Sequence, residues 1–142
     1  MSDPEELPLS ALEDSSDGRG WSFSLDQERL SIMSAVKGVH IAAIRPGAVR
    51  GNHYHLERTE LITVLFQDLW SLHWDTGEGT STHHRRFDGS GAISLVPPAG
   101  WSHAVRNDGS TDLMIVAFND KSFDDRADDP STRDTFPRVV TD

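Results

Sequence analysis

Two histidines and a glutamate lie close together in the sequence, in a pattern that suits metal binding. His53 and His55 are separated by one residue, and Glu60 follows five residues after His55. Alternate side chains of a β-strand point to the same face, so the two imidazoles would project side by side from one strand. On an unbroken strand Glu60 would face away from them. A turn at residues 56–59 is short enough for a hairpin and would remove that objection.

Short strands joined by turns are the elements that must position these side chains. Runs of alternating apolar residues, separated by Gly, Pro, Asn and Asp turn signals, recur along the chain, and no convincing helix is visible. The expected strands cover residues 21–25, 32–36, 39–44, 49–55, 60–66, 69–74, 92–96, 103–107 and 113–118. This pattern predicts an all-β protein, an antiparallel sandwich or barrel.

Hydropathy also predicts where some of these segments lie. Residues 39–44 are apolar on both faces of a strand, which is typical of a strand in the middle of a sheet. Trp70 and Trp74 fall on one side of their strand and are expected to pack in the core. Residues 83–86, His-His-Arg-Arg, follow a loop rich in Gly, Ser and Thr. They are expected in a solvated loop, with the mouth of a site as the alternative.

Composition limits the class of protein. The chain has 142 residues, which suits one domain with a substantial core, and 13 Lys and Arg against 23 Asp and Glu give a formal net charge of -10. This charge argues against nucleic acid or an anionic membrane surface as the partner. The absence of cysteine excludes disulfides and a thiolate zinc site. No secretory signal or membrane span is visible, so a cytoplasmic protein is expected.

The two ends differ from the middle of the chain. Residues 1–17 and 119–142 are acidic and polar, and segments of this kind bury too little apolar surface to offset the entropy of ordering them. We therefore expect an N-terminal arm at 1–17, a barrel at 18–118 and an extended C-terminal arm at 119–142. Such arms either fray or dock on the barrel or on a neighbour.

Two spaced motifs give the chain a resemblance to the cupins, a superfamily of small jelly-roll barrels. The first motif runs from Gly47 through His53 and His55 to Glu60, with five, one and four residues between them. The second runs from Pro98-Ala99-Gly100 through His103 to Asn107, with two and three residues between them. The resemblance implies an antiparallel jelly-roll barrel in which His53, His55, Glu60 and His103 bind a metal ion.

The donor atoms of these four residues agree with that implication. Three neutral imidazole nitrogens and one carboxylate oxygen leave positions open on a five- or six-coordinate ion. We expect a divalent transition metal as the cofactor. Zn, Fe, Ni, Co, Mn and Cu suit the set about equally, so the identity of the metal stays open.

A narrower resemblance points to the nucleotide-sugar branch of the cupins, which includes deoxysugar 3,5-epimerases and capsular-polysaccharide epimerase cupins. It rests on residues 17–21 and 46–55. In the metal-free 3,5-epimerases the histidine aligned with His53 acts as a base, helped by a tyrosine and an aspartate elsewhere. The single tyrosine here is Tyr54, inside the motif itself. His53 is therefore expected to be a metal ligand instead of a base.

Other residues are weaker candidates for a substrate pocket. Arg50 has the charge to neutralise an anionic ligand. Tyr54 and Trp101 lie within the two motifs, and an indole can form part of a pocket wall. His40 and His73 fit no site and are interpreted as structural.

Three functions remain open at this point. The first is a metal-dependent isomerase or epimerase acting on a carbonyl compound such as a nucleotide sugar, in which the ion polarises C=O and a base removes an α-proton. The second is a non-haem iron dioxygenase, and the third is a non-catalytic, metal-stabilised ligand-binding or regulatory cupin. We expect the first, with a small-molecule substrate and a homodimer formed through edge strands and arms.

Overall fold

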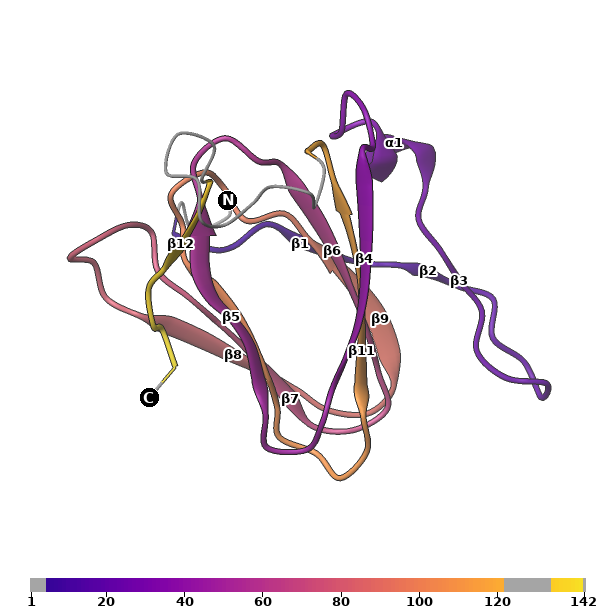
Figure 1. The fold of residues 1–142 in the computed structure, drawn as a ribbon. Helices are drawn as coiled ribbons and strands as arrows, with labels where there is room; N and C mark the ends of the chain where they lie inside the picture. The colour runs from indigo at the N-terminus through magenta and orange to yellow at the C-terminus, as the bar shows by residue number, and fades with distance from the viewer. Residues whose placement is uncertain (1–4, 122–133, 142) are drawn as a thin grey trace.

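The computed structural model describes residues 5–121 and 134–141, and these residues are almost entirely in strands and turns (Figure 1). The elements, in chain order, are β1 (Leu9–Ala11), β2 (Glu13–Asp14), β3 (Phe23–Ser24), α1 (Gln27–Leu30), β4 (Gly38–Ile44), β5 (Val49–His55), β6 (Glu60–Phe66), β7 (Trp70–Trp74), β8 (His83–Phe87), β9 (Gly91–Leu95), β10 (His103–Asn107), β11 (Leu113–Asn119) and β12 (Thr135–Pro137). The all-β class that the sequence predicts is confirmed.

Two antiparallel five-stranded sheets form the body of the molecule. The first sheet has the order β1-β9-β6-β11-β4, and the second has the order β12-β5-β10-β7-β8. From β4 onward the chain switches between the sheets at every connection except that from β7 to β8, and it forms an antiparallel jelly roll. A tight turn at residues 45–48 joins β4 to β5, which lie opposite each other across the barrel in Figure 1.

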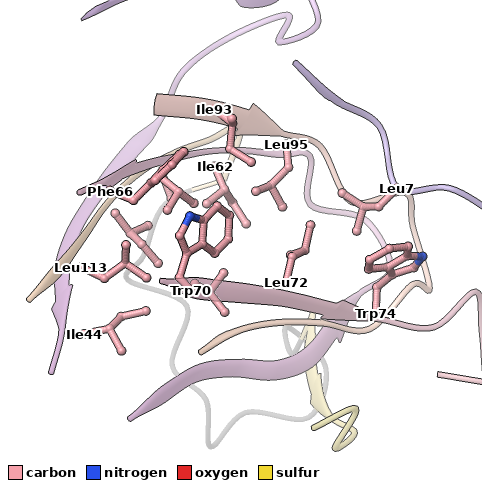
Figure 2. Close-up of a cluster of buried hydrophobic side chains, with 14 residues drawn as sticks. Leu7, Ile44, Ile62, Phe66, Trp70, Leu72, Trp74, Ile93, Leu95 and Leu113 are labelled. Carbon is pink, nitrogen blue, oxygen red and sulfur yellow. The ribbon is translucent and has the colours of Figure 1, made fainter. Parts of the chain in front are cut away.

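The core lies between the sheets, where alternate side chains of the strands point inward. Trp70, Leu72 and Trp74 of β7 point across the interior toward side chains of the first sheet such as Ile62 and Leu95 (Figure 2). Trp70 and Leu72 are completely buried and Trp74 almost so, which confirms the expected packing of the two tryptophans.

The position expected for residues 39–44 is wrong. β4 lies at the edge of the first sheet and pairs within the described residues with β11 alone. Its outward side chains are exposed, and Ile41 reaches 68%. The apolar run is therefore explained by two different environments: Ile44 is buried in the core, whereas Val39 and Ile41 form part of an exposed apolar face.

Two further segments differ from the sequence-based expectation. Residues 83–86 belong to a strand, β8, because His83 stacks on Trp74 with ring centroids 5.5 Å apart and Phe87 stacks on Trp70 at 4.3 Å. Residues 32–36 are not a strand but follow the short helix α1 as a turn and irregular backbone.

Both terminal segments add strands to the barrel in the parts that the structure describes. β1 pairs with β9, and β12 pairs with β5, placing Thr135 opposite His55. The small hairpin of β2 and β3 instead projects away from the barrel on the side of the first sheet (Figure 1). Among the described residues, no helix has the length and hydropathy that crossing a membrane requires.

Candidate metal centre

The three histidines and the glutamate predicted as ligands come together at one end of the barrel. One potential ligand atom from each of them lies within 4.8 Å of the others. His53 and His55 project from β5, and His103 stands opposite His53 in the paired strand β10. Glu60 opens β6, in the other sheet. The cluster therefore joins the two sheets. Residues 56–59 form the expected turn, which lets Glu60 face the two histidines of β5.

A bulge in β5 controls which side chains face this cluster. Gly51 pairs with Ala104 and His53 with His103, so Asn52 is an extra residue on this strand, with a positive φ of 57°. A bulge of this kind re-aims the side chains beside it. As a result Arg50 and His53, which an unbroken strand would point to opposite faces, both line the same cavity.

The hydrogen bonds around the cluster leave two imidazole nitrogens without partners. His103 Nδ1 lies 3.4 Å from the carbonyl oxygen of Trp101, and since a carbonyl only accepts, Nδ1 carries the proton. Nε2 of His103 and Nε2 of His55 are buried without a hydrogen bond, at 3.5 and 3.6 Å from Glu60 Oε1. With its proton on Nδ1, His103 turns an Nε2 lone pair toward the Glu60 carboxylate, and a metal ion between the two would relieve their repulsion, so this donor set fits a bound metal ion.

The electrostatics of the cluster favour its ligand-competent protonation state. Burial lowers the pKa of His53 to about 4, and the neighbouring His103 and His55 reinforce that shift. Burial raises the pKa of Glu60, but its polar contacts with His103 and His55 outweigh this effect and hold that pKa well below its ordinary value. A neutral imidazole and an ionised carboxylate are the forms that bind metals.

A cavity of about 140 Å³ opens onto three of the four residues, His53, Glu60 and His103. Its wall also includes His40 from β4 and Arg50 from β5. Sequence reasoning interpreted His40 as structural and missed its place in this cavity. The alternation of side chains along a strand could have indicated it, because His40 lies on the same face of β4 as Ala42 and Ile44, the face that points inward.

The weaker pocket candidates fall in different places. Arg50 lines the cavity, and its Nε donates a hydrogen bond of 3.3 Å to the carbonyl of Ala43 across the opening. Tyr54 lies on the opposite face of β5, stacked on Phe136 at 5.3 Å and beneath the Arg138 guanidinium. The structure therefore does not bring Tyr54 into the cavity.

Three other groups that the sequence analysis named also lie outside the cavity wall. Trp101 packs against the hydrophobic core. His83 is 3.3 Å from a carboxylate oxygen of Glu5, so the segment 83–86 does not line the mouth of the site. His73 shares a 2.8 Å hydrogen bond with Ser71 and stacks on His84, in agreement with its structural interpretation.

Comparison with known sequences shows the family. The polysaccharide biosynthesis C-terminal domain matches residues 17–132, most of the chain. The chain belongs to this family. No curated protein sequence matches it.

Solved structures similar to this family member share its cupin-type fold. CapF, the capsular polysaccharide assembling protein of Staphylococcus aureus, is 21% identical with a TM-score of 0.57 over 91% of this chain and 34% of the CapF chain. A mutant of the 3,4-ketoisomerase QdtA of Thermoanaerobacterium thermosaccharolyticum is 11% identical, with a TM-score of 0.64 over 92% of this chain and 86% of its own. The RmlC epimerase of Mycobacterium tuberculosis is 14% identical, with a TM-score of 0.63 over 82% and 64%. The chain thus spans about a third of the length of CapF.

Proposed function

We propose that the chain is a metal-dependent isomerase or epimerase that acts on a carbonyl compound, such as the keto sugar of a nucleotide sugar. The observation that carries the proposal is the cluster of His53, His55, Glu60 and His103, three of which line a cavity, with Nε2 of His55 and of His103 buried and without a hydrogen bond among the described residues. These four residues would hold a divalent transition metal. When bound there, the ion would polarise a substrate carbonyl and make the adjacent C–H more acidic.

Two residues of the cavity wall, His40 and Arg50, are assigned the proton transfer and the binding of the substrate. His40 carries an imidazole that is outside the ligand set and borders the same cavity, and we assign it the transfer of the α-proton. Histidine is the side chain most often used for this task near neutral pH. Arg50, on the β5 side of the cavity, would bind and orient an anionic part of the substrate.

The substrate class is supported by what similar structures contain. The QdtA mutant was solved with TDP-4-keto-6-deoxyglucose, and an RmlC epimerase of Legionella pneumophila with dTDP-4-keto-rhamnose. Both compounds place a ketone beside a C–H bond, which is the arrangement that the proposed chemistry needs. Family membership in polysaccharide biosynthesis agrees with an activated sugar as substrate.

Two measurements on protein purified without an affinity tag test the proposal. Elemental analysis is expected to find about one divalent transition metal per chain. Incubation in D₂O with TDP-4-keto-6-deoxyglucose is expected to introduce deuterium next to the ketone, detected by mass spectrometry. His40→Asn should lower the exchange rate by about 10²- to 10⁴-fold, the usual contribution of a positioned base, while its metal content stays at the wild-type value.

The matched control is His84→Asn, which removes an exposed histidine on β8 that does not line the cavity. It is expected to exchange at the wild-type rate. A His40→Asn variant as fast as wild type would remove His40 from the mechanism. Metal-loaded protein that exchanges no proton with nucleotide 4-keto sugars would contradict the isomerase proposal, and iron with oxygen uptake would favour a dioxygenase instead.

A further inference from the structure

The C-terminal segment reaches the candidate metal centre through two neighbouring residues, Asp134 and Thr135, here called the C-terminal clasp. Thr135 opens β12 and stands opposite His55 in β5. Its Oγ1 lies 3.0 Å from His55 Nδ1. Asp134, which is 4% exposed, lies against the turn that follows His55. The clasp is about eighty residues away in sequence from the side chains it contacts.

Thr135 contacts the imidazole nitrogen that faces away from the cluster. If Nε2 of His55 is to bind a metal, its lone pair must be free and the ring proton must sit on Nδ1. Nδ1–H then donates to Thr135 Oγ1. The threonine thus fixes the ring plane and can accept the Nδ1 proton, whereas the Trp101 carbonyl, which only accepts, determines the tautomer of His103.

Asp134 fixes the backbone between two of the four residues of the cluster. One carboxylate oxygen accepts hydrogen bonds from the backbone N–H groups of Leu56 and Glu57, at 3.2 and 2.7 Å, and the other accepts from Arg58 at 3.1 Å. These residues form the turn that joins His55 to Glu60. The Arg58 guanidinium, itself buried, lies 3.6 Å from the same carboxylate.

We propose that the C-terminal clasp is a positioning device for the metal centre, with Thr135 setting the orientation of His55 and Asp134 setting the turn that brings Glu60 into reach. The proposal rests on the metal centre of the proposed function. It makes the affinity for the metal depend on a segment that provides none of the ligands. Hydrogen-bond partners of metal-bound histidines typically change metal affinity by about 10- to 100-fold.

The test compares two threonines of the same segment. Thr135→Val keeps the shape of the side chain and removes the hydroxyl next to His55. Thr141→Val is the matched control, because Thr141 Oγ1 accepts a 3.0 Å hydrogen bond from Asn52, a β5 residue outside the ligand set. Thr135→Ser restores the hydroxyl. Zn²⁺ affinity is measured by competition with a chromogenic chelator, and the visible spectrum of the Co²⁺ form reports the ligand geometry.

Thr135→Val is expected to bind Zn²⁺ about 10- to 100-fold more weakly than wild type and to change the Co²⁺ spectrum. Thr135→Ser and Thr141→Val should stay within about threefold of wild type. Urea unfolding of the metal-free proteins measures any general loss of stability. We expect Thr135→Val and Thr141→Val to have similar free energies of unfolding, so that a difference in metal affinity between them reports on the site.

Three results would overturn the proposal in different ways. A tightly binding wild type with an equally tight Thr135→Val variant contradicts the clasp and leaves the metal centre intact. Equal losses in Thr135→Val and Thr141→Val mean that the segment only stabilises β5. A wild-type protein that binds neither Zn²⁺ nor Co²⁺ overturns the proposed function itself, and the clasp with it.

Discussion

His53 belongs to the candidate metal centre, and its burial has a consequence that can be measured in solution. Its imidazole lies between His55 and His103, with ring centroids 4.8 and 4.9 Å away. A positive charge on His53 would be poorly solvated and would face two further imidazoles, so its pKa falls from 6.5 to about 4. The folded chain therefore takes up a proton at this position less readily than the unfolded chain.

This difference predicts how the stability of metal-free protein depends on pH. Between pH 6.5 and 4.5 the unfolded chain binds a proton at His53 and the folded chain does not, so the free energy of unfolding falls as the pH falls, by up to about 1.4 kcal/mol per pH unit. Glu60, with a lowered pKa, stays ionised in this window. Urea titrations in the presence of a chelator measure the slope.

His53→Gln provides the comparison for that slope. The variant has no titrating group at this position and should lose less stability than wild type over the same two pH units. Equal slopes in the two proteins would show that the protonation of His53 is not what destabilises the fold.

At the scale of elements, the pairing of β5 with β10 holds His53 and His103 together, and Gly51 is the point where the two backbones come closest. Gly51 has a φ of 100°, and a Cβ built there would lie 2.6 Å from the carbonyl oxygen of His103. Only glycine combines this positive φ with so close an approach of a neighbouring strand.

Gly51→Ala is therefore expected to separate β5 from β10 and to disturb the metal cluster. We expect a loss of about 3 kcal/mol in the free energy of unfolding, from backbone strain and overpacking together, with lower metal occupancy. Gly47→Ala is the matched control, because Gly47 also has a positive φ, 81°, but a Cβ there meets nothing within 4 Å.

The control should lose about 1 kcal/mol, the cost of the left-handed conformation alone, and keep its metal. Urea unfolding and elemental analysis distinguish the two variants. If Gly51→Ala and Gly47→Ala behaved alike, the close approach to β10 would carry no importance for the site.

The parts of the fold that sequence reasoning predicted depend on local rules. The alternation of β5 and the turn before Glu60 involve neighbours in sequence, and so does the alternation of Trp70 and Trp74 in β7. The edge position of β4 was missed because strand order is decided by residues far away in the chain. An apolar run looks the same in either position.

Parts of the candidate site and a further strand outside it were missed for similar reasons. Asp134 and Thr135 lie in an acidic, polar segment with no periodic pattern, and their partners are more than seventy residues away. β8 was missed because its histidine and arginine side chains suggested a solvated loop, whereas His83 and Phe87 stack on tryptophans of β7. The binding of metal by the cluster stays a prediction.

At the scale of the whole molecule, the outer face of the first sheet carries a row of apolar side chains in a strongly acidic chain. Val39 and Ile41 of β4 are exposed there, with Met114 of β11 beside them. A groove lined by Trp21, Phe23, Leu65, Val116 and Phe118, among others, continues this face toward the β2–β3 hairpin. A second copy can meet this face about a two-fold axis without bringing like charges together.

We therefore predict a homodimer that forms through this face, whereas the sequence led us to expect one formed through edge strands and arms. Ile41→Glu should convert a dimer to a monomer in sedimentation velocity, because it would bury two carboxylates against apolar surface. Val139→Glu is the matched control, since Val139 is 70% exposed but lies on the C-terminal segment beside β5. A monomeric wild type, or a dimeric Ile41→Glu variant, would contradict the prediction.

The arrangement of the four cluster residues has a consequence for how the barrel holds together. His53, His55 and His103 belong to one sheet and Glu60 to the other, and the chain contains no cysteine. An ion bound by all four would be a cross-link between the sheets, the part that a disulfide plays in many secreted β-sandwiches. Unlike a disulfide, this cross-link would open and close with the supply of metal, so the rigidity of the barrel would follow the metal content of its surroundings.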